Sequence, residues 1–228
     1  MRFLLVRDSE MSPDAAGGEL AGMADAKSHW ERVYSSKKPT DVSWYQPHLR
    51  LSLELIQRSG ITPEDPVIDV GGGASTLVDD LLDLGFHRVT ALDISEKAID
   101  VSRRRLGVRA DRVRWIAEDV LRAALPAGGY RLWHDRAVFH FLTDAGDRAE
   151  YIRQLRSALS PGGFALIATF SPEGPQKCSG LEVCKYSPAR LVQELGAGFT
   201  IIESASEAHQ TPSNVTQAFQ YTLVSYGG

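Results

Sequence analysis

Residues 67–77 read Val-Ile-Asp-Val-Gly-Gly-Gly-Ala-Ser-Thr-Leu, and this stretch decides the fold of the chain. The short apolar run from Val67 to Val70 follows Pro66 and predicts a buried strand. Three glycines come next, and an apolar-periodic segment to Leu84 predicts a helix. Glycine has no Cβ, so the backbone turns sharply there and a ligand lies directly against it, facing the first N–H groups of the helix. The order strand, tight turn, helix therefore predicts a ligand site at the turn.

Two carboxylates distinguish the kind of ligand. A dinucleotide fingerprint has glycine at the first, third and sixth positions of the turn, but the sixth position here is Thr76. Asp69, two residues before the first glycine, would repel a pyrophosphate and attract the ammonium of an amino-acid-like cofactor. Asp93 ends the next expected strand, twenty residues after Gly73, where an acid accepts hydrogen bonds from a ribose.

The pattern Asp-x-Gly-x-Gly, followed by a strand that ends in an acid, resembles the class I S-adenosylmethionine (SAM) methyltransferases. The resemblance implies SAM as the cofactor and S-adenosylhomocysteine as the product. It implies that Asp119 accepts from the adenine amino group and that the backbone N–H of Val120 meets a ring nitrogen. The cofactor contacts expected in the core are Asp69, Gly71, Gly72, Gly73, Asp93, Ile94, Asp119 and Val120.

Expected strands alternate with expected helices five times along the chain, which predicts an α/β fold: a doubly wound, mostly parallel sheet with helices on both faces. The methyltransferase resemblance implies a Rossmann-like sheet of seven strands with the last one reversed. Residues 1–26 show no sustained hydrophobic period and are expected to be a mobile tail. We expect the methyltransferase domain at 27–228, with a helical lid at 27–60 and a core at 66–228.

Aromatic residues in the expected lid narrow the resemblance. Trp30-x-x-x-Tyr34 and Trp44-Tyr45-Gln46-Pro47 look like the N-terminal lid of the thiopurine and thiol methyltransferase group. Closure of these rings over SAM would exclude water, and their faces would attract the sulfonium. The alternative is simple packing of an N-terminal helix on the core. The expected lid contacts to SAM are Trp30, Tyr34 and Trp44.

The same group resemblance covers the segment from Trp133 to Val138 and Gly146-Asp147-Arg148. This chain departs from the group pattern because His134 is inserted and Ala137 stands where the group has glycine. The residues expected to contact the methyl acceptor are Tyr45, Arg136 and Arg148.

The expected chemistry is general-base help near the end of the fourth strand. Asp135 ends that strand, and a neutral imidazole at His134 or His140 would accept a proton from the acceptor. The chain lacks the Asn/Asp-Pro-Pro-Tyr signature of nucleobase amino methylation. A thiolate needs little general-base help, so we expect a small-molecule acceptor with a thiol or a related soft nucleophile.

Two alternatives to this function stay open. Asp135-Arg136-Ala137-Val138 occupies the place of the Asp-Lys-Gly-Thr motif of seven-stranded protein-lysine methyltransferases, although only the acid and a basic residue match. A catalytically inert SAM-binding module is the alternative from another class.

Composition limits the partners and the compartment. The 228 residues carry a net charge of −4, which argues against an obligatory nucleic-acid partner because phosphate binding needs clustered positive charge. No apolar run approaches membrane-spanning length, so no membrane partner is expected. The two cysteines, Cys178 and Cys184, form no disulfide framework and have no histidine at metal-ligand spacing. We therefore expect a cytoplasmic protein without a metal.

Overall fold

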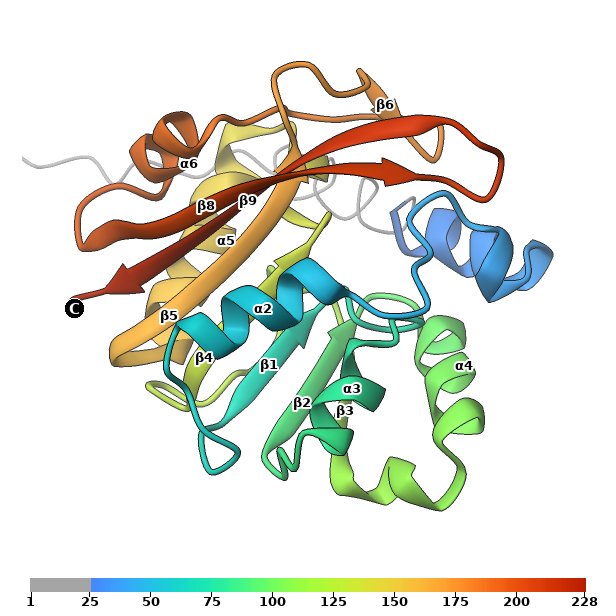
Figure 1. Cartoon of the computed structure of the whole chain (residues 1–228), viewed down its shortest axis with the longest axis horizontal. Coiled ribbons are helices and arrows are strands. Elements are labelled where there is room, and N and C mark those ends of the chain that lie inside the picture. Colours follow the sequence, from blue (N-terminus) through green and yellow to red (C-terminus); the bar gives the residue numbers. More distant parts are fainter. Residues whose placement is uncertain (1–25) are drawn as a thin grey trace, which may run out of the picture.

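The computed structural model describes residues 26–228 (Figure 1), so the expected mobile tail lies outside the described residues except for Ala26. The helices are one at residues 26–36, Arg50–Arg58 (α2), Leu77–Asp83 (α3), Glu96–Leu106 (α4), Ala145–Ala158 (α5) and Pro188–Leu195 (α6), with short 3-10 helices at Pro39–Asp41 (η1), Gly107–Arg112 (η2) and Phe139–Phe141 (η3). The strands are Val67–Val70 (β1), Val89–Asp93 (β2), Val113–Ala117 (β3), Tyr130–Arg136 (β4), Leu159–Phe170 (β5), Lys177–Cys178 (β6), Leu181–Glu182 (β7), Phe199–Gln210 (β8) and Thr216–Tyr226 (β9).

Seven of the strands in the described part form one twisted sheet in the order β3-β2-β1-β4-β5-β9-β8. Strands β1 to β5 are mutually parallel, while β9 runs antiparallel to both β5 and β8. The expected α/β class and the reversed last strand are confirmed. The order of the parallel strands reverses at β1, so β1 and β4 flank the switch point where open α/β sheets bind ligands.

Helices cover both faces of this sheet, with α2 in front of the strands and α5 behind them in Figure 1. The front layer packs α2 and α3 on one hydrophobic cluster, and the back layer packs α5 and α6 on the other. Alternation along β1 divides its side chains between the two layers: Val67 belongs to the front cluster, and Ile68 and Val70 belong to the back cluster. Asp69 therefore points toward the α2 face although it is buried in an apolar strand.

The same alternation sorts the end of β4. Trp133 and Asp135 point toward α5, whereas His134 and Arg136 point toward the α2 face. His134 is the register partner of Asp69 on β1, so the two side chains meet on one face. Strand parity therefore separates residues that follow one another in sequence.

The two C-terminal strands are longer than their apolar segments, which run from Phe199 to Glu203 and from Phe219 to Tyr226. The structure extends β8 to Gln210 and starts β9 at Thr216. In the added part of β8, exposed residues alternate with half-buried or buried ones, and its side chains are polar apart from two alanines, so it lacks the apolar signal that marks a core strand. This extension carries the hairpin over the loop at residues 42–46 (Figure 1).

Candidate active site

Neighbouring side chains approach the glycine turn after β1 so closely that its glycines cannot carry a Cβ without a clash. Gly71 has a φ of +70°, and a Cβ there would lie 2.1 Å from Cγ2 of Val138. A Cβ on Gly73 would lie 2.5 Å from the Cβ of Ala98, which keeps the turn against α4. The first glycine also lines the central cavity, so bare backbone forms part of the cavity wall.

Asp93, at the end of β2, holds this turn through hydrogen bonds to its backbone. One carboxylate oxygen accepts the N–H of Gly73 at 3.0 Å, and the other accepts the N–H of Ser95 at 2.8 Å. Burial raises the pKa of Asp93 to about 6, against the lowering effect of these two backbone donors. Since each oxygen keeps a lone pair and the residue lines the cavity, it can still accept a ligand hydroxyl.

The cavity has a volume of about 730 Å³, within the range of small-molecule sites. One end is formed by the carboxyl ends of β1 and β2 and by the loop after β3. The residues of this end include Val70, Gly71, Leu92, Asp93, Ile94, Asp119, Val120, Leu121 and Arg122. Asp119 turns its carboxylate back onto the N–H of Leu121 at 2.9 Å, which fixes the loop that carries Val120.

Aromatic rings form another part of the cavity wall. Trp30 contacts Trp44 and Phe141 with ring centroids 5.7 and 5.1 Å apart, both edge to face. Tyr34 meets Trp44 at 6.2 Å in the same geometry. All four rings line the cavity, and Cys178 and Leu181 complete that part. Each expected lid residue therefore lies in the cavity wall.

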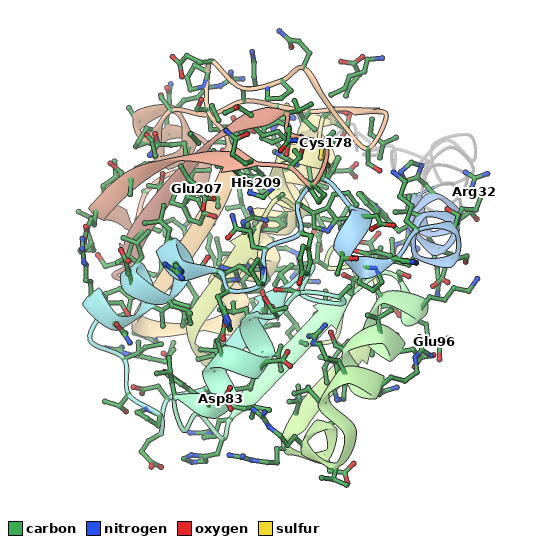
Figure 2. All side chains as sticks on the ribbon, turned by 45° about the vertical axis from the view of Figure 1, so that its right-hand side comes forward. Arg32, Asp83, Glu96, Cys178, Glu207 and His209 are labelled. Carbon is green, nitrogen blue, oxygen red and sulfur yellow. The ribbon has the colours of Figure 1, made fainter. Side chains whose placement is uncertain are left out.

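The loop that carries Trp44 is fastened to β8. Nε2 of His209 donates to the carbonyl of Ser43 at 2.7 Å. The amide of Gln46 donates to Oε1 of Glu207 at 2.9 Å and to Nδ1 of His209 at 3.0 Å. Figure 2 shows Glu207 and His209 next to each other on the hairpin, with Cys178 on the same side of the molecule. The loop is thus held by a strand about 160 residues away in sequence.

The three candidate bases lie outside the cavity lining. His134 is buried, with Nδ1 2.7 Å from Oδ1 of Asp69 and Nε2 2.9 Å from Oγ of Ser52 on α2. Both ring nitrogens are therefore engaged. Asp135 is buried beneath the segment that follows β4. It accepts hydrogen bonds from the N–H groups of Val138 and Phe139 and from the hydroxyl of Tyr151. Neither side chain lines the cavity, because strand parity points them to opposite faces of the sheet: Asp135 points toward α5, and His134 lines only a smaller hollow beside the glycine turn.

His140 is fully buried between Phe141 and Phe170. Its Nδ1 accepts the N–H of Phe170 at 3.4 Å, so the proton of the neutral ring sits on Nε2. Desolvation, and then the charge of Arg136, lower the pKa of this imidazole to about 3. The placement and the tautomer do not fit a base for the acceptor.

The three residues expected to contact the acceptor lie at different places in the structure. Arg148 donates to Glu194 at 2.6 Å and to the carbonyls of Leu142 and Thr143, which ties α5 to α6 away from the cavity. Tyr45 lines a smaller hollow beside the glycine turn. Arg136 lines both the cavity and that hollow. Of these three predicted residues, only Arg136 reaches the cavity wall.

The sequence analysis missed several residues that build the site. Phe141 and Cys178 line the cavity, Ser52 and Tyr151 hold the buried polar side chains, and Glu207 and His209 hold the loop. Only Phe141 carried a local signal, since it follows the expected strand end closely. The other five come from segments that only the folded chain brings together.

The parts of the cavity fit an adenosyl amino acid: a bare glycine turn, an acid placed for a ribose, an acidic loop after β3, and aromatic rings that attract a sulfonium. The fold and the site together define an α/β enzyme that binds a nucleoside-containing cofactor at the carboxyl ends of its strands.

Comparison with known proteins gives the family. Residues 67–163 match a family described as a methyltransferase domain. EEF1A lysine methyltransferase 2 of Homo sapiens is 21% identical over 209 residues, which is 86% of this chain and 83% of that protein. The eEF1A lysine and N-terminal methyltransferase of Mus musculus is 27% identical over 146 residues, 64% of this chain but 20% of that protein.

A solved structure of 1,6-didemethyltoxoflavin-N1-methyltransferase from Burkholderia thailandensis, with bound S-adenosylhomocysteine, shares the fold. Its TM-score is 0.66 at 18% identity, over 98% of this chain and 94% of that one. Residues 67–163 carry a methyltransferase domain, the chain has the fold of the class I enzymes, and it is a SAM-dependent methyltransferase with SAM as its cofactor. Within residues 26–228 we find no helix of the length and apolar character that crossing a membrane requires.

Proposed function

We propose that this enzyme transfers the methyl group of SAM to the ε-amine of a lysine on a protein. Two sets of relatives whose names give eEF1A lysine methylation support this acceptor, one of them over most of both chains. The observation that carries the proposal is the lining of the cavity, which combines four aromatic rings with three carboxylates. We call Trp30, Tyr34, Trp44 and Phe141 the aromatic slot, and Asp144, Asp147 and Glu150 the acidic mouth.

The assignment of the cofactor end is part of the proposal. We place the adenosine along Asp93, Ile94, Asp119 and Val120, next to the turn at Gly71, because these residues line one end of the cavity. SAM supplies the activated methyl group, so the chain has to bind, align and exclude water. In this proposal residues 27–60 act as the lid, and 66–228 form the core.

The aromatic slot suits a lysine side chain. Trp30, Tyr34, Trp44 and Phe141 present apolar surface for the methylene stem and shield the terminal nitrogen from water. Burial among these rings disfavours the charged amine and lowers its pKa, which yields the neutral nucleophile that methyl transfer needs. The slot thereby supports amine methylation without an imidazole base among the described residues of the cavity lining.

The acidic mouth consists of three carboxylates. Asp144, Asp147 and Glu150, at the start of α5, line the cavity, and Asp144 is exposed to solvent. Carboxylates at a cleft raise the local concentration of a cationic acceptor. Because these carboxylates attract a cation and repel a thiolate, they favour a lysine-bearing surface over the thiol acceptor that the sequence suggested.

The test compares protein and small-molecule acceptors directly. The enzyme is incubated with SAM carrying a tritiated methyl group and with either an eEF1A-type elongation factor, the same factor with its lysines acetylated, or a panel of small thiols. We expect label in the untreated factor only, and peptide mass spectrometry should place one added methyl on a lysine. Turnover of the thiols with an unlabelled protein would instead establish the thiol acceptor.

A charge-neutral variant tests the mouth. Asp144→Asn keeps the side-chain oxygen that caps α5 through the N–H groups of Gly146 and Asp147. Combined with Glu150→Gln, it should raise KM for the protein acceptor several-fold, with a weaker dependence on salt, and leave the Kd of S-adenosylhomocysteine unchanged. An unchanged KM would remove the acidic mouth from the argument.

A further inference from the structure

The loop at residues 42–46 and the polar end of β8 meet in a hydrogen-bonded cluster. Its members are Gln46, Glu207 and His209, and we call them the latch. Glu207 and His209 lie next to each other on β8 (Figure 2), and they are 21% exposed at the side chain and 4% exposed, respectively. Groups this far removed from water have to match each donor with an acceptor inside the protein.

Glu207 fixes the orientation of the Gln46 amide. A carboxylate only accepts hydrogen bonds, so the nitrogen of the amide, and not its oxygen, has to face Oε1 of Glu207. The other carboxylate oxygen, Oε2, accepts from the hydroxyl of Tyr221 at 2.9 Å, which holds the carboxylate in place. The amide nitrogen therefore donates both of its hydrogens, one to Glu207 and one toward His209.

The Gln46 amide in turn fixes the protonation state of His209. Nδ1 of the ring lies 3.0 Å from Nε2 of Gln46, so it has to accept. Nε2 of the ring lies 2.7 Å from the carbonyl of Ser43, so it has to donate. The neutral tautomer with its hydrogen on Nε2 satisfies both contacts. A second hydrogen, on Nδ1, would place one N–H against another and break the bond to Gln46.

The surroundings of the ring favour this neutral form. Burial lowers the pKa of His209, while the hydrogen bond to the Ser43 carbonyl raises it. Of the charged groups that face the ring, Arg136 on β4 lowers the pKa and Glu207 on β8 raises it, and β9 presents the ring of Phe219 at 6.0 Å. The net pKa lies below the ordinary value of about 6.5. The latch is therefore complete above that pH and is lost as pH falls through the lowered pKa.

The latch acts on the cavity through Trp44, which lies in the loop that it holds. The ring of Trp44 lines the cavity and meets Trp30 and Tyr34 edge to face. We propose that the latch positions Trp44 in the cavity wall, and that it does so only while the His209 ring is neutral. Protonation of the ring releases the loop and weakens cofactor binding. The proposal rests on the assignment of residues 27–60 as the lid over SAM and is independent of the lysine acceptor.

Two other anchors of the loop remain when the latch opens. Nη1 of Arg136 donates to the carbonyl of Trp44 at 3.0 Å, and Oγ1 of Thr76 donates to the carbonyl of Gln46 at 3.1 Å. These bonds do not involve His209, so protonation should loosen the loop without unfolding the chain. The expected effect is therefore a severalfold change in the Kd of the cofactor and not a loss of binding.

Calorimetry with S-adenosylhomocysteine at about pH 7.5 and about pH 5 tests the latch on both sides of the histidine titration. The measured quantity is the ratio of the two Kd values. His209→Gln keeps an amide donor for the Ser43 carbonyl and an amide oxygen for Gln46, but it does not titrate. The net contribution of one hydrogen bond corresponds to about two- to tenfold in Kd, so the ratio should be larger in the wild type than in His209→Gln by about that factor. Asp93 titrates in both proteins, so its effect cancels.

Two further variants separate the latch from other titrating groups. His87→Gln is the matched control, because His87 pairs with Glu64 at an exposed position, and it should keep the wild-type ratio. In Gln46→Glu combined with Glu207→Gln, the amide and the carboxylate exchange places. The carboxylate at position 46 then faces Nδ1 of His209 and favours the protonated ring. This double variant should reverse the pH dependence and bind relatively more tightly at the lower pH.

NMR of the imidazole and indole nitrogens of the wild type keeps the test decisive if a variant does not fold. At about pH 7.5 the His209 ring should carry its hydrogen on Nε2, and the indole N–H resonance of Trp44 should shift with the midpoint of the ring titration. A hydrogen on Nδ1 would overturn the proposal.

Equal Kd ratios in the wild type and His209→Gln would also overturn the proposal. If the Trp44 resonance does not follow the ring, the latch itself is wrong; if it does follow, the assignment of the lid over SAM is wrong. Failure to label a protein lysine would contradict the proposed acceptor but leave these binding results standing.

Discussion

Replacement of Gly71 by alanine tests the geometry of the cofactor turn. Gly71 has a φ of +70°, which costs an alanine about 1–3 kcal/mol. Its new Cβ would also lie 2.1 Å from Cγ2 of Val138, against the usual carbon contact of about 3.5–4.0 Å. Relief of this overlap adds about 1–3 kcal/mol. The free energy of unfolding should therefore fall by about 2–6 kcal/mol, a large share of the about 5–15 kcal/mol typical of a domain.

A second substitution separates the two contributions. Val138→Ala removes the clashing methyl group but leaves the backbone conformation unchanged. The double variant should recover the steric part, so a double-mutant cycle should give a coupling energy of about 1–3 kcal/mol. Gly60→Ala is the matched control, because Gly60 has a φ of +79° and a Cβ there would meet nothing within 4 Å. It should lose only the backbone part, and Val138→Ala should not rescue it.

Urea unfolding followed by circular dichroism measures these free energies, and calorimetry with S-adenosylhomocysteine measures the effect on the cavity. Gly71→Ala should weaken binding because the turn forms the cavity wall, whereas Gly60→Ala should not. The reasoning is refuted if Gly71→Ala loses no more stability than Gly60→Ala, or if Val138→Ala recovers nothing.

Three further outcomes follow from the structure. Ala137 has a φ of +71°, so Ala137→Gly should stabilise the chain by up to about 2 kcal/mol in urea unfolding, and a loss of stability would contradict the strain. Burial raises the pKa of Asp93 and Asp135 to about 6, so between about pH 4 and 6 the folded chain binds more protons than the unfolded chain. The contribution of these two carboxyl groups to the free energy of unfolding should therefore fall as pH rises from about 4 to 6. Replacing either aspartate by asparagine should flatten this pH dependence in urea unfolding. Amide exchange over residues 28–46 should slow when S-adenosylhomocysteine is added, and exchange that is already slow and does not change would show fixed packing instead of a lid.

Local sequence determined the cofactor end of the site. The strand at Val67, the glycine turn and Asp93 lie within 27 residues, and their geometry follows from one strand–turn–helix–strand unit. The alternation of elements was enough to predict the parallel sheet. Such features depend on neighbours in the chain, so their pattern is visible without the tertiary structure.

Which side chains near the end of β4 reach the cavity was decided only by tertiary structure. His134, Asp135 and Arg136 follow one another in sequence, yet one binds Ser52 on α2, one binds Tyr151 on α5, and only the arginine reaches the cavity. The sequence pointed to this strand end, but it could not say which residue faces the cavity. That depends on strand parity together with what packs on each face.

The lid shows the same division. Its aromatic residues were visible in the sequence, but what holds them in place was not. Glu207 and His209 lie on the polar extension of β8 and contact residues 43–46 across about 160 positions. A polar strand segment carries little hydrophobic signal, and a contact between distant segments exists only once the sheet has brought them together. Local sequence thus determined the glycine turn and its supporting carboxylate, and tertiary structure decided which distant side chains reach the cavity.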